Sequence, residues 1–404
     1  RNPGAFVYVA AVSGSGVGAG DTVVCGISGG VRSVTVFQAL APPGSGPYKS
    51  FDASTGSATG GLTVEQLGAL CGGGADASSS AGHTVSSDFV VNAAPQLGVT
   101  WDLQSAAAPQ REWIAVTYGE GRFVSVAEIS NEGGVPATGN RAMYSEDGVT
   151  WQMGSGAPDK NTWRSVTYGA GKFVAVGRAT AGGTADRAMY SEDGINWTPA
   201  TTPGSLNWYG VTYGEGLFVA VAYTGSGSGS QVMTSPDGVT WTARSTPASP
   251  GNWRSVTYGD GRFVAVSQTG ADQVMTSEDG ITWTSRSAAV SNQWLDVTYG
   301  DGKFVAVALT ATAPQIMTSP DGFTWTSRES TSPSPWVEVA YGGGMFVAVA
   351  YSGGEGNQVM TSTDGFTWTS RRSPSGNFWH GVVFGEDKFV ATAVTGDQRV
   401  MTSP

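Results

Sequence analysis

The chain has 404 residues, a formal net charge of −11 and only 13% charged residues. This acidic balance disfavours nucleic acid as a partner, because phosphate binding needs clustered Lys and Arg. No run of about 20 apolar residues occurs, so the sequence predicts no membrane span. With 60 glycines and 14 tryptophans, the composition is typical of an ordered all-β protein with many short strands and turns.

Residues 1–95 lack internal repeats, and we expect them to form a small β-rich domain. Residues 5–12, 21–27, 31–38 and 87–92 are predicted strands from their β-branched and aromatic content, and residues 63–70 a short helix. Cys25 and Cys71 are the two cysteines of the chain, and we interpret them as one disulfide, with two free thiols as the alternative. A disulfide would place the protein outside the cytoplasm. Because the chain starts at Arg1 rather than Met, we expect a processed or truncated form.

A seven-residue phrase, Ser-x-Asp-Gly-x-Thr-Trp, recurs six times from residue 145 onward, with Asn196 replacing Thr in the second copy. Asp-Gly between two β-prone runs is the strongest short hairpin signal. It predicts a type I′ turn with positive φ at both central residues. We expect each aspartate of the phrase to accept backbone N–H bonds within its own turn. These turn residues are Asp147, Asp193, Asp237, Asp279, Asp321 and Asp364.

A second phrase, Trp-x-x-Val-x-Tyr-Gly, occurs with small variations seven times, at spacings of 50, 45, 45, 41, 42 and 43 residues. Each copy continues into a Phe-Val-Ala-Val run and then into the hairpin phrase. Four strand-like runs per period predict the blades of a β-propeller, with strands A to D counted from the centre outward. The copies predict seven blades over residues 96–404. Their tryptophans are Trp113, Trp163, Trp208, Trp253, Trp294, Trp336 and Trp379.

The two ends of the repeat region complement each other. The last copy stops at Ser403-Pro404, before its strand D, whereas residues 97–101 (Leu-Gly-Val-Thr-Trp) resemble a strand D without a strand C. We therefore expect residues 99–103 to complete the seventh blade, which removes exposed sheet edges. The predicted fold is all-β: a seven-bladed β-propeller closed by an N-terminal strand and preceded by a small β-rich domain.

The hairpin phrase resembles the Asp-box, Ser-x-Asp-x-Gly-x-Thr-Trp, of sialidase-like (BNR-repeat) propellers, with one residue fewer between Asp and Gly. The resemblance covers roughly residues 97–404 and implies a structural box at the turn between strands C and D. Sialidase-like enzymes also need an arginine cluster, a Tyr with a Glu partner, an acidic acid/base residue and an Arg-Ile-Pro type motif. This sequence shows no such motif, and most of its arginines recur at positions fixed by the repeat. The resemblance therefore implies architecture more than activity.

Function in a repeat protein is best sought where the copies differ. The residues one and two positions after the strand A Trp vary between copies, and the innermost strand places them near the axial channel. Two of them, Asp296 and Glu338, belong to neighbouring blades. A carboxylate pair about 5–10 Å apart would suit glycoside hydrolysis; the alternative is that both are solvated or bonded to neighbouring blades. The candidate binding residues are Arg164, Tyr209, Arg254, Asp296, Glu338 and His380.

The two faces of the predicted propeller differ. Variable loops at residues 128–141, 179–187 and 224–230 favour one face for a glycan or protein ligand. The strand A tryptophans near this face would either stack sugars or pack between blades. The opposite face carries acidic turns, for which we weigh Ca²⁺ binding against a solvated acidic surface. These turn acids are Glu120, Glu215, Asp260, Asp301, Glu386 and Asp387. The sequence shows no His/Cys spacing for a metal and no cofactor signature.

The combined reading is a non-catalytic, extracellular or cell-surface protein. We expect subunits that self-associate through residues 1–95, by strand addition in a filament or surface layer, and display the propeller for adhesion or ligand binding. One alternative is a secreted monomeric glycan-binding propeller. A second alternative is a sialidase-like glycoside hydrolase.

Overall fold

The computed structural model describes residues 97–108, 110–128, 140–158, 161–179, 186–223, 230–247, 251–310, 314–351 and 357–403, together with the backbone of five earlier strands. The chain divides into two compact units, Arg1–Gln96 and Leu97–Pro404.

The first unit contains a five-stranded antiparallel sheet in the order β1-β2-β3-β4-β5. Its strands are β1 (Phe6–Val9), β2 (Thr22–Ile27), β3 (Ser33–Ala39), β4 (Lys49–Asp52) and β5 (Ser57–Thr59). The first three coincide with predicted strands. Strands β4 and β5 were not predicted, because short polar runs carry little of the β-branched pattern. The predicted strand at 87–92, the predicted helix at 63–70 and Cys71 lie outside the described residues, so the disulfide of Cys71 with Cys25 stays a prediction.

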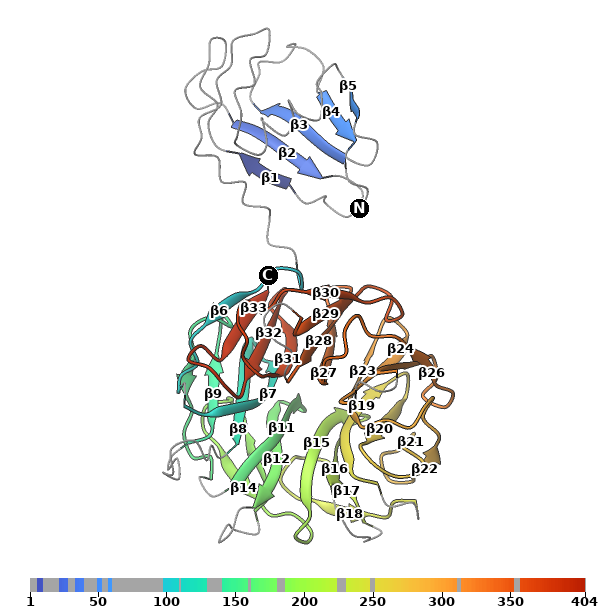
Figure 1. Ribbon diagram of the computed structural model, residues 1–404. Coiled ribbons are helices and arrows are strands. Elements are labelled where there is room, and N and C mark those ends of the chain that lie inside the picture. The colour runs from blue at the N-terminus through green and yellow to red at the C-terminus, as the bar shows by residue number, and fades with distance from the viewer. Residues whose placement is uncertain are drawn as a thin grey trace. The chain divides into compact units, whose positions relative to one another are not determined.

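The second unit is a seven-bladed β-propeller of antiparallel four-stranded sheets (Figure 1). Strands A, innermost, are β7 (Glu112–Gly119), β11 (Asn161–Gly169), β15 (Asn207–Gly214), β19 (Trp253–Gly259), β23 (Trp294–Gly300), β27 (Trp336–Gly342) and β31 (Trp379–Gly385). Strands B are β8 (Arg122–Glu128), β12 (Lys172–Ala179), β16 (Leu217–Tyr223), β20 (Arg262–Ser267), β24 (Lys303–Ala308), β28 (Met345–Ala350) and β32 (Lys388–Ala393). Strands C are β9 (Ala142–Ser145), β13 (Ala188–Ser191), β17 (Val232–Ser235), β21 (Val274–Ser277), β25 (Ile316–Ser319), β29 (Val359–Ser362) and β33 (Val400–Ser403). Strands D are β10 (Gln152–Met153), β14 (Thr198–Ala200), β18 (Thr242–Arg244), β22 (Thr284–Arg286), β26 (Thr326–Arg328), β30 (Thr369–Arg371) and β6 (Asp102–Gln104).

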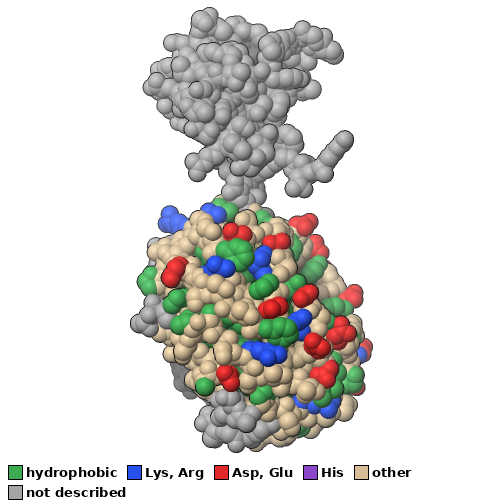
Figure 2. All heavy atoms as spheres, turned by 90° about the vertical axis from the view of Figure 1, so that its right-hand side faces the viewer, with side chains coloured by type: hydrophobic (Ala, Val, Ile, Leu, Met, Phe, Trp, Pro, Cys, Tyr) green, Lys and Arg blue, Asp and Glu red, His purple; other side chains and the backbone are tan. Residues whose placement is uncertain are grey.

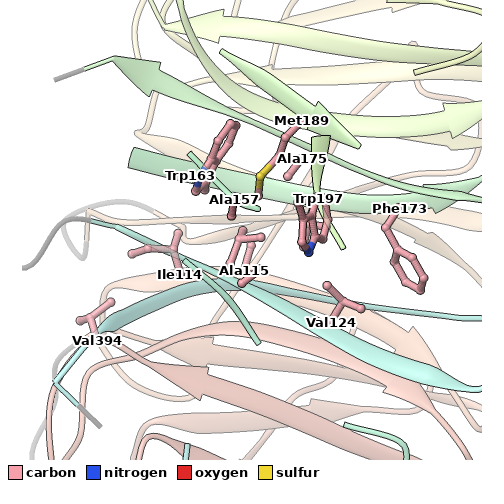
Figure 3. Close-up of a cluster of buried hydrophobic side chains, with 13 residues drawn as sticks. Ile114, Ala115, Val124, Ala157, Trp163, Phe173, Ala175, Met189, Trp197 and Val394 are labelled. Carbon is pink, nitrogen blue, oxygen red and sulfur yellow. The ribbon is translucent and has the colours of Figure 1, made fainter. Parts of the chain in front are cut away.

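The core lies between blades. Figure 3 shows one such cluster, in which Trp163 of β11 and Trp197 face Ile114 and Val124 of the preceding blade. All seven strand A tryptophans are at most 1% exposed, so they pack between blades and are not available to stack sugars. The repeated Tyr-Gly pair has a similar cause. A Cβ added at Gly169 would lie 2.1 Å from the Tyr213 ring of the next blade, so only glycine permits this contact.

The type I′ geometry belongs to the A–B turns and not to the Asp-Gly turns. At the first A–B turn, Glu120 and Gly121 have φ values of 48° and 69°. At the first Asp-Gly turn the glycine, Gly148, has a positive φ of 74°, whereas Asp147 does not have a positive φ. The prediction of positive φ at both residues of the Asp-Gly turn was therefore wrong. The aspartate stabilises its turn through its side chain instead, and needs no left-handed backbone for that.

The hairpin phrase forms a hydrogen-bonded unit around its aspartate. One carboxylate oxygen of Asp147 accepts the N–H groups of Val149 and Thr150, at 2.8 and 2.7 Å, and the Ser145 hydroxyl at 2.9 Å. The Ser145 oxygen in turn accepts the Gly148 N–H, and the indole N–H of Trp151 donates to the Gly148 carbonyl. Burial is the largest single influence on Asp147 and raises its pKa, but the hydrogen bonds to the charged form together outweigh it and lower the pKa to about 2. The other five aspartates accept the same two backbone N–H groups.

The ring closes as predicted, through a hairpin split between the two ends of the propeller. Strand β6 pairs antiparallel with β33, with Asp102 opposite Thr402. The Gly98 N–H donates to the Ser403 hydroxyl at 2.7 Å, and the Trp101 indole N–H to the Gly98 carbonyl at 3.1 Å. These are the hydrogen bonds of an unbroken hairpin phrase, with Leu97 in place of the aspartate. The strand begins at Asp102 rather than at residue 99, because Trp101 still belongs to the turn.

Candidate functional site

A β-bulge in every strand A determines which side chains reach the propeller axis. In all seven blades the register of strand A against strand B shifts between the repeated Trp and the second residue after it. A bulge sets two residues of one strand against one residue of its partner, and so re-aims side chains. The two residues that follow each Trp therefore face the channel together, which strict alternation along a strand would forbid.

These bulge residues line one cavity of about 310 Å³ at the centre of the ring. All seven blades contribute to it, so it is an axial channel site and not a groove between two blades. The volume lies at the lower end of the range of small-molecule sites, about 300–1,000 Å³. The structure brings together all six candidate residues that the sequence predicted; their role in binding stays a prediction. They are Arg164, Tyr209, Arg254, Asp296, Glu338 and His380.

Blades 1 to 4 give the channel a cationic and aromatic arc. The Arg164 guanidinium forms an ion pair with Glu128, and Arg178 reaches the same carboxylate at 2.9 Å. Tyr209 lies between two guanidinium groups, since the Cζ atoms of Arg164 and Arg254 are each 4.8 Å from its ring centroid. Arg254 also lies 5.6 Å from the Tyr223 ring. Cation–π contacts of this kind hold the guanidinium groups in fixed positions.

Blades 5 and 6 give the channel an acidic arc. The two carboxylate oxygens of Asp296 accept the Ser255 hydroxyl at 2.6 Å and the Val339 N–H at 2.8 Å. Glu338 accepts the Val382 N–H of the next blade through one oxygen, at 3.3 Å. Each carboxyl therefore ties its own blade to its neighbour, as the structural alternative to a catalytic pair anticipates. The second oxygen of Glu338 has no hydrogen bond to a described residue.

Burial raises the pKa of both carboxyl groups. Burial raises the pKa of Asp296 to about 6, although its hydrogen bonds favour the ionised form. Burial, and then the charge of Asp296, raise the pKa of Glu338 well above its usual value. Both side chains keep some surface in contact with the channel, so water there moderates these shifts. Glu338 therefore takes up a proton more readily than an ordinary glutamate, and Asp296 more readily than an ordinary aspartate.

His380 is held as a neutral imidazole on the seventh blade. Its Nδ1 lies 2.8 Å from the Ile114 carbonyl, and because a carbonyl can only accept, Nδ1 carries the proton. Burial lowers the pKa of His380 to about 3, and the charges of Arg164 and Arg254 act in the same direction. The Nε2 lone pair is the remaining acceptor of the ring. The Tyr351 ring meets this imidazole edge-on, with centroids 6.3 Å apart.

The sequence reasoning missed a second tier of residues, at the end of each strand B. Glu128 joins the arginine pair there, Tyr223 contacts Arg254, and Tyr351 contacts His380. The signal was present in the sequence, because this position also varies from copy to copy. It reads Glu128, Arg178, Tyr223, Gln268, Leu309, Tyr351 and Val394 along the chain.

The two faces of the propeller show fewer candidate binding residues than the channel in the described part of the chain. The variable loops predicted for partner binding lie mostly outside the described residues. On the opposite face three of the six turn acids accept a hydrogen bond from the next blade: the Tyr168 hydroxyl donates to Glu120 at 2.6 Å, and Tyr258 and Tyr118 donate to Glu215 and Glu386. Asp260 and Asp301 pair with a cation of their own blade, Arg262 and Lys303. Over the described residues no three His, Cys, Asp or Glu side chains gather as a metal site. Figure 2 shows acidic and basic side chains interspersed on one side of the propeller.

Comparisons with known proteins agree on the fold. No family model and no curated protein matches the chain. A streptogramin B lyase structure is similar with a TM-score of 0.61 and 13% identity, over 75% of this chain and 96% of that one. A catalytically inactive histidine-to-alanine variant of virginiamycin B lyase from Staphylococcus aureus with quinupristin gives 0.62 and 9%, over 75% and 98%. YCF48 from Cyanidioschyzon merolae gives 0.53 and 14%, over 75% and 98%.

At these identities the likeness establishes a seven-bladed β-propeller and nothing finer. In the described part of the chain no helix is long and apolar enough to span a bilayer.

Proposed function

We propose that the propeller is a non-catalytic binding module whose axial channel takes a small polar ligand. One observation carries the proposal: residues that vary between otherwise repeated blades converge on a single cavity of about 310 Å³. The repeated residues are explained by the fold, since they pack between blades or bond their own turns. Arginine, tyrosine, carboxyl and imidazole groups that break the repeat at one place are explained by a ligand. The resemblance to Asp-box propellers is part of this proposal, because it supports a structural role for the repeated hairpin phrase.

Binding is tested by calorimetry of the full chain against a panel of monosaccharides, short oligosaccharides and small organic acids. We expect a ligand whose affinity falls in Tyr209→Ala, because Tyr209 orders both arginines of the cationic arc. The matched control is Val149→Ala at a hairpin tip, where the side chain is 43% exposed and remote from the channel. Equal binding by both variants would place the ligand elsewhere on the molecule, and no binding across the panel would refute the proposal.

The setting that we propose for this module is the cell surface or the extracellular space, with self-association through residues 1–95. The acidic, glycine-rich composition supports the location. The sheet order supports the assembly, because β1 and β5 each pair on one side only among the described strands and so offer edges for strand addition. Measuring the native mass with and without residues 1–95 tests this. A monomer in both cases would remove the assembly idea and leave a monomeric binding propeller.

An enzymatic function is the second candidate, favoured by one observation: Glu338, a carboxyl with raised pKa, lies near Asp296. Such a pair can divide acid and base roles in glycoside hydrolysis. Against it, both oxygens of Asp296 are already hydrogen-bonded. Asp296→Asn and Glu338→Gln are compared with the parent on a glycan panel. Absence of hydrolysis by the parent would end this candidate.

A further inference from the structure

Arg254 is a guanidinium of the channel that has no anionic partner among the described residues. It is half-buried on strand β19 and lines the cavity. Its recorded contacts are the faces of Tyr209 and Tyr223; among the described residues, no carboxylate lies within 4 Å of it and no acceptor is hydrogen-bonded to it. Arg164, the other channel arginine, is paired with Glu128. The Arg254 guanidinium thus lies on aromatic rings at the wall of the cavity, and its five N–H donors have no acceptor among the described residues.

The local charge balance explains why the Arg254 side of the channel favours an anionic ligand. Glu128 is one carboxylate, and two guanidinium groups, those of Arg164 and Arg178, already share it. Among the described side chains joined by these contacts, three guanidinium groups, those of Arg164, Arg178 and Arg254, thus share one carboxylate. Arginine does not deprotonate in proteins, so burial cannot relieve this excess of positive charge by neutralisation. A bound anion relieves it, and in a partly desolvated site it does so with stronger hydrogen bonds than in water.

The opposite arc offers a different chemistry to the same ligand. Asp296 accepts hydrogen bonds, and Glu338 presents one oxygen without a described partner. Carboxyl groups of this kind bind hydroxyl groups, and repel a second anion. The two sides of the cavity therefore differ in charge: an anionic group is favoured at blades 2 to 4 and disfavoured at blades 5 and 6.

We propose that the channel binds a small hydroxylated acid, with its anionic group on the Arg254 guanidinium and its hydroxyl groups toward Asp296 and Glu338. This proposal rests on the binding function proposed above and narrows it to one ligand class. A carboxylate, sulfate or phosphate group satisfies the same fork of donors.

The experiment compares glucuronate with glucose as probes on the full chain, by calorimetry at fixed ionic strength. Acetate, sulfate and phosphate are added as separate arms to identify the preferred anionic group. We expect glucuronate to bind and glucose to bind at least tenfold more weakly. Arg254→Gln should weaken glucuronate binding about 10- to 100-fold, the usual cost of losing a charge-assisted hydrogen bond. Arg254→Lys keeps the positive charge but loses the paired N–H donors of the guanidinium, so its affinity for glucuronate should lie between those of the parent and of Arg254→Gln.

Arg286→Gln is the matched control, because Arg286 bonds Thr276 and stacks on Phe323 outside the channel. Its glucuronate affinity should equal that of the parent. Thermal unfolding of each variant identifies a loss of fold. If Arg254→Gln destabilises the protein, suppression of parent binding by added sulfate still reports on an anion site. Equal binding of glucose and glucuronate, or an affinity unaffected by Arg254→Gln, would overturn this inference while leaving the binding function intact. A ligand that binds outside the channel would refute the binding function itself.

Discussion

Removing the Ser403 hydroxyl should weaken the pairing of β6 with β33, where the two ends of the propeller meet. The Ser403 oxygen accepts the buried Gly98 N–H at 2.7 Å, across the junction of the two ends of the propeller. Ser403→Ala leaves this N–H without its partner, at a cost of about 1–3 kcal/mol. Leu97 stands where the other hairpins have aspartate, so no carboxylate supports this turn. The cost should therefore appear as local opening of β6 from β33.

Ser319→Ala is the matched control. Ser319 accepts the Gly322 N–H at 2.8 Å in an unbroken hairpin, where Asp321 still holds two other N–H groups. Both variants lose the same hydrogen bond, so global denaturation should report similar losses of unfolding free energy. Native-state hydrogen exchange should separate them. The amides paired between β6 and β33 should exchange about 5- to 150-fold faster in Ser403→Ala, as the same 1–3 kcal/mol implies, and at the parent rate in Ser319→Ala. Unchanged exchange of β6 in Ser403→Ala would refute the reasoning.

Three further predictions concern stability. The melting temperature, measured between pH 7 and 2, should have its maximum near about pH 4–5. Because the pKa of Asp296 is raised to about 6, its protonation stabilises the fold as the pH falls through that value. Because the pKa of Asp147 is lowered to about 2, the stability that the hairpin aspartates contribute is lost below about pH 4. Asp296→Asn should flatten the upper limb, and a persistent rise there would contradict this assignment. Asp387→Gly should raise the unfolding free energy by about 0.5–1 kcal/mol in urea, because a non-glycine residue at φ 55° is strained; Gly302→Asp, the reverse change in another A–B turn, should lower it. Trp253→Ala should cost about 3–5 kcal/mol by loss of a core side chain that is 1% exposed, and a value under 1 kcal/mol would argue against packing between blades.

The periodicity of the sequence was sufficient to predict the propeller, but the sequence did not predict the geometry of the turns. The spacing of the strand A tryptophans gave the blade number, and the unmatched residues 97–101 gave the closure. The turn type was misassigned because Asp-Gly and Glu-Gly carry similar local signals. Which of them takes a left-handed first residue depends on hydrogen bonds such as that of Asp147 with Val149, which propensity does not reveal.

The composition of the channel was predictable and its chemistry was not. Variation after each strand A Trp located Arg164, Arg254 and Asp296 in one place. The pairing of Arg164 with Glu128, and the absence of such a partner for Arg254 among the described residues, depend on which strand B ends lie beside which strand A. That is a property of the closed ring, so only the tertiary structure distinguishes the two arginines.

The β-bulges also bear on how such a chain can change over generations. Each blade keeps most of its packing in the Trp, the Tyr-Gly pair and the hairpin phrase, and places two adjacent side chains on the axis. Some of these axial side chains, such as Ile114 and Leu295, also pack in the core, whereas the side chains of Tyr209 and Arg254 stay partly exposed to the channel. Substitution at the partly exposed positions alters the channel and leaves the repeated core in place. A duplicated blade starts as a copy of the scaffold with two axial positions at which it can diverge, so a ring of seven such copies can change its ligand while its fold stays the same.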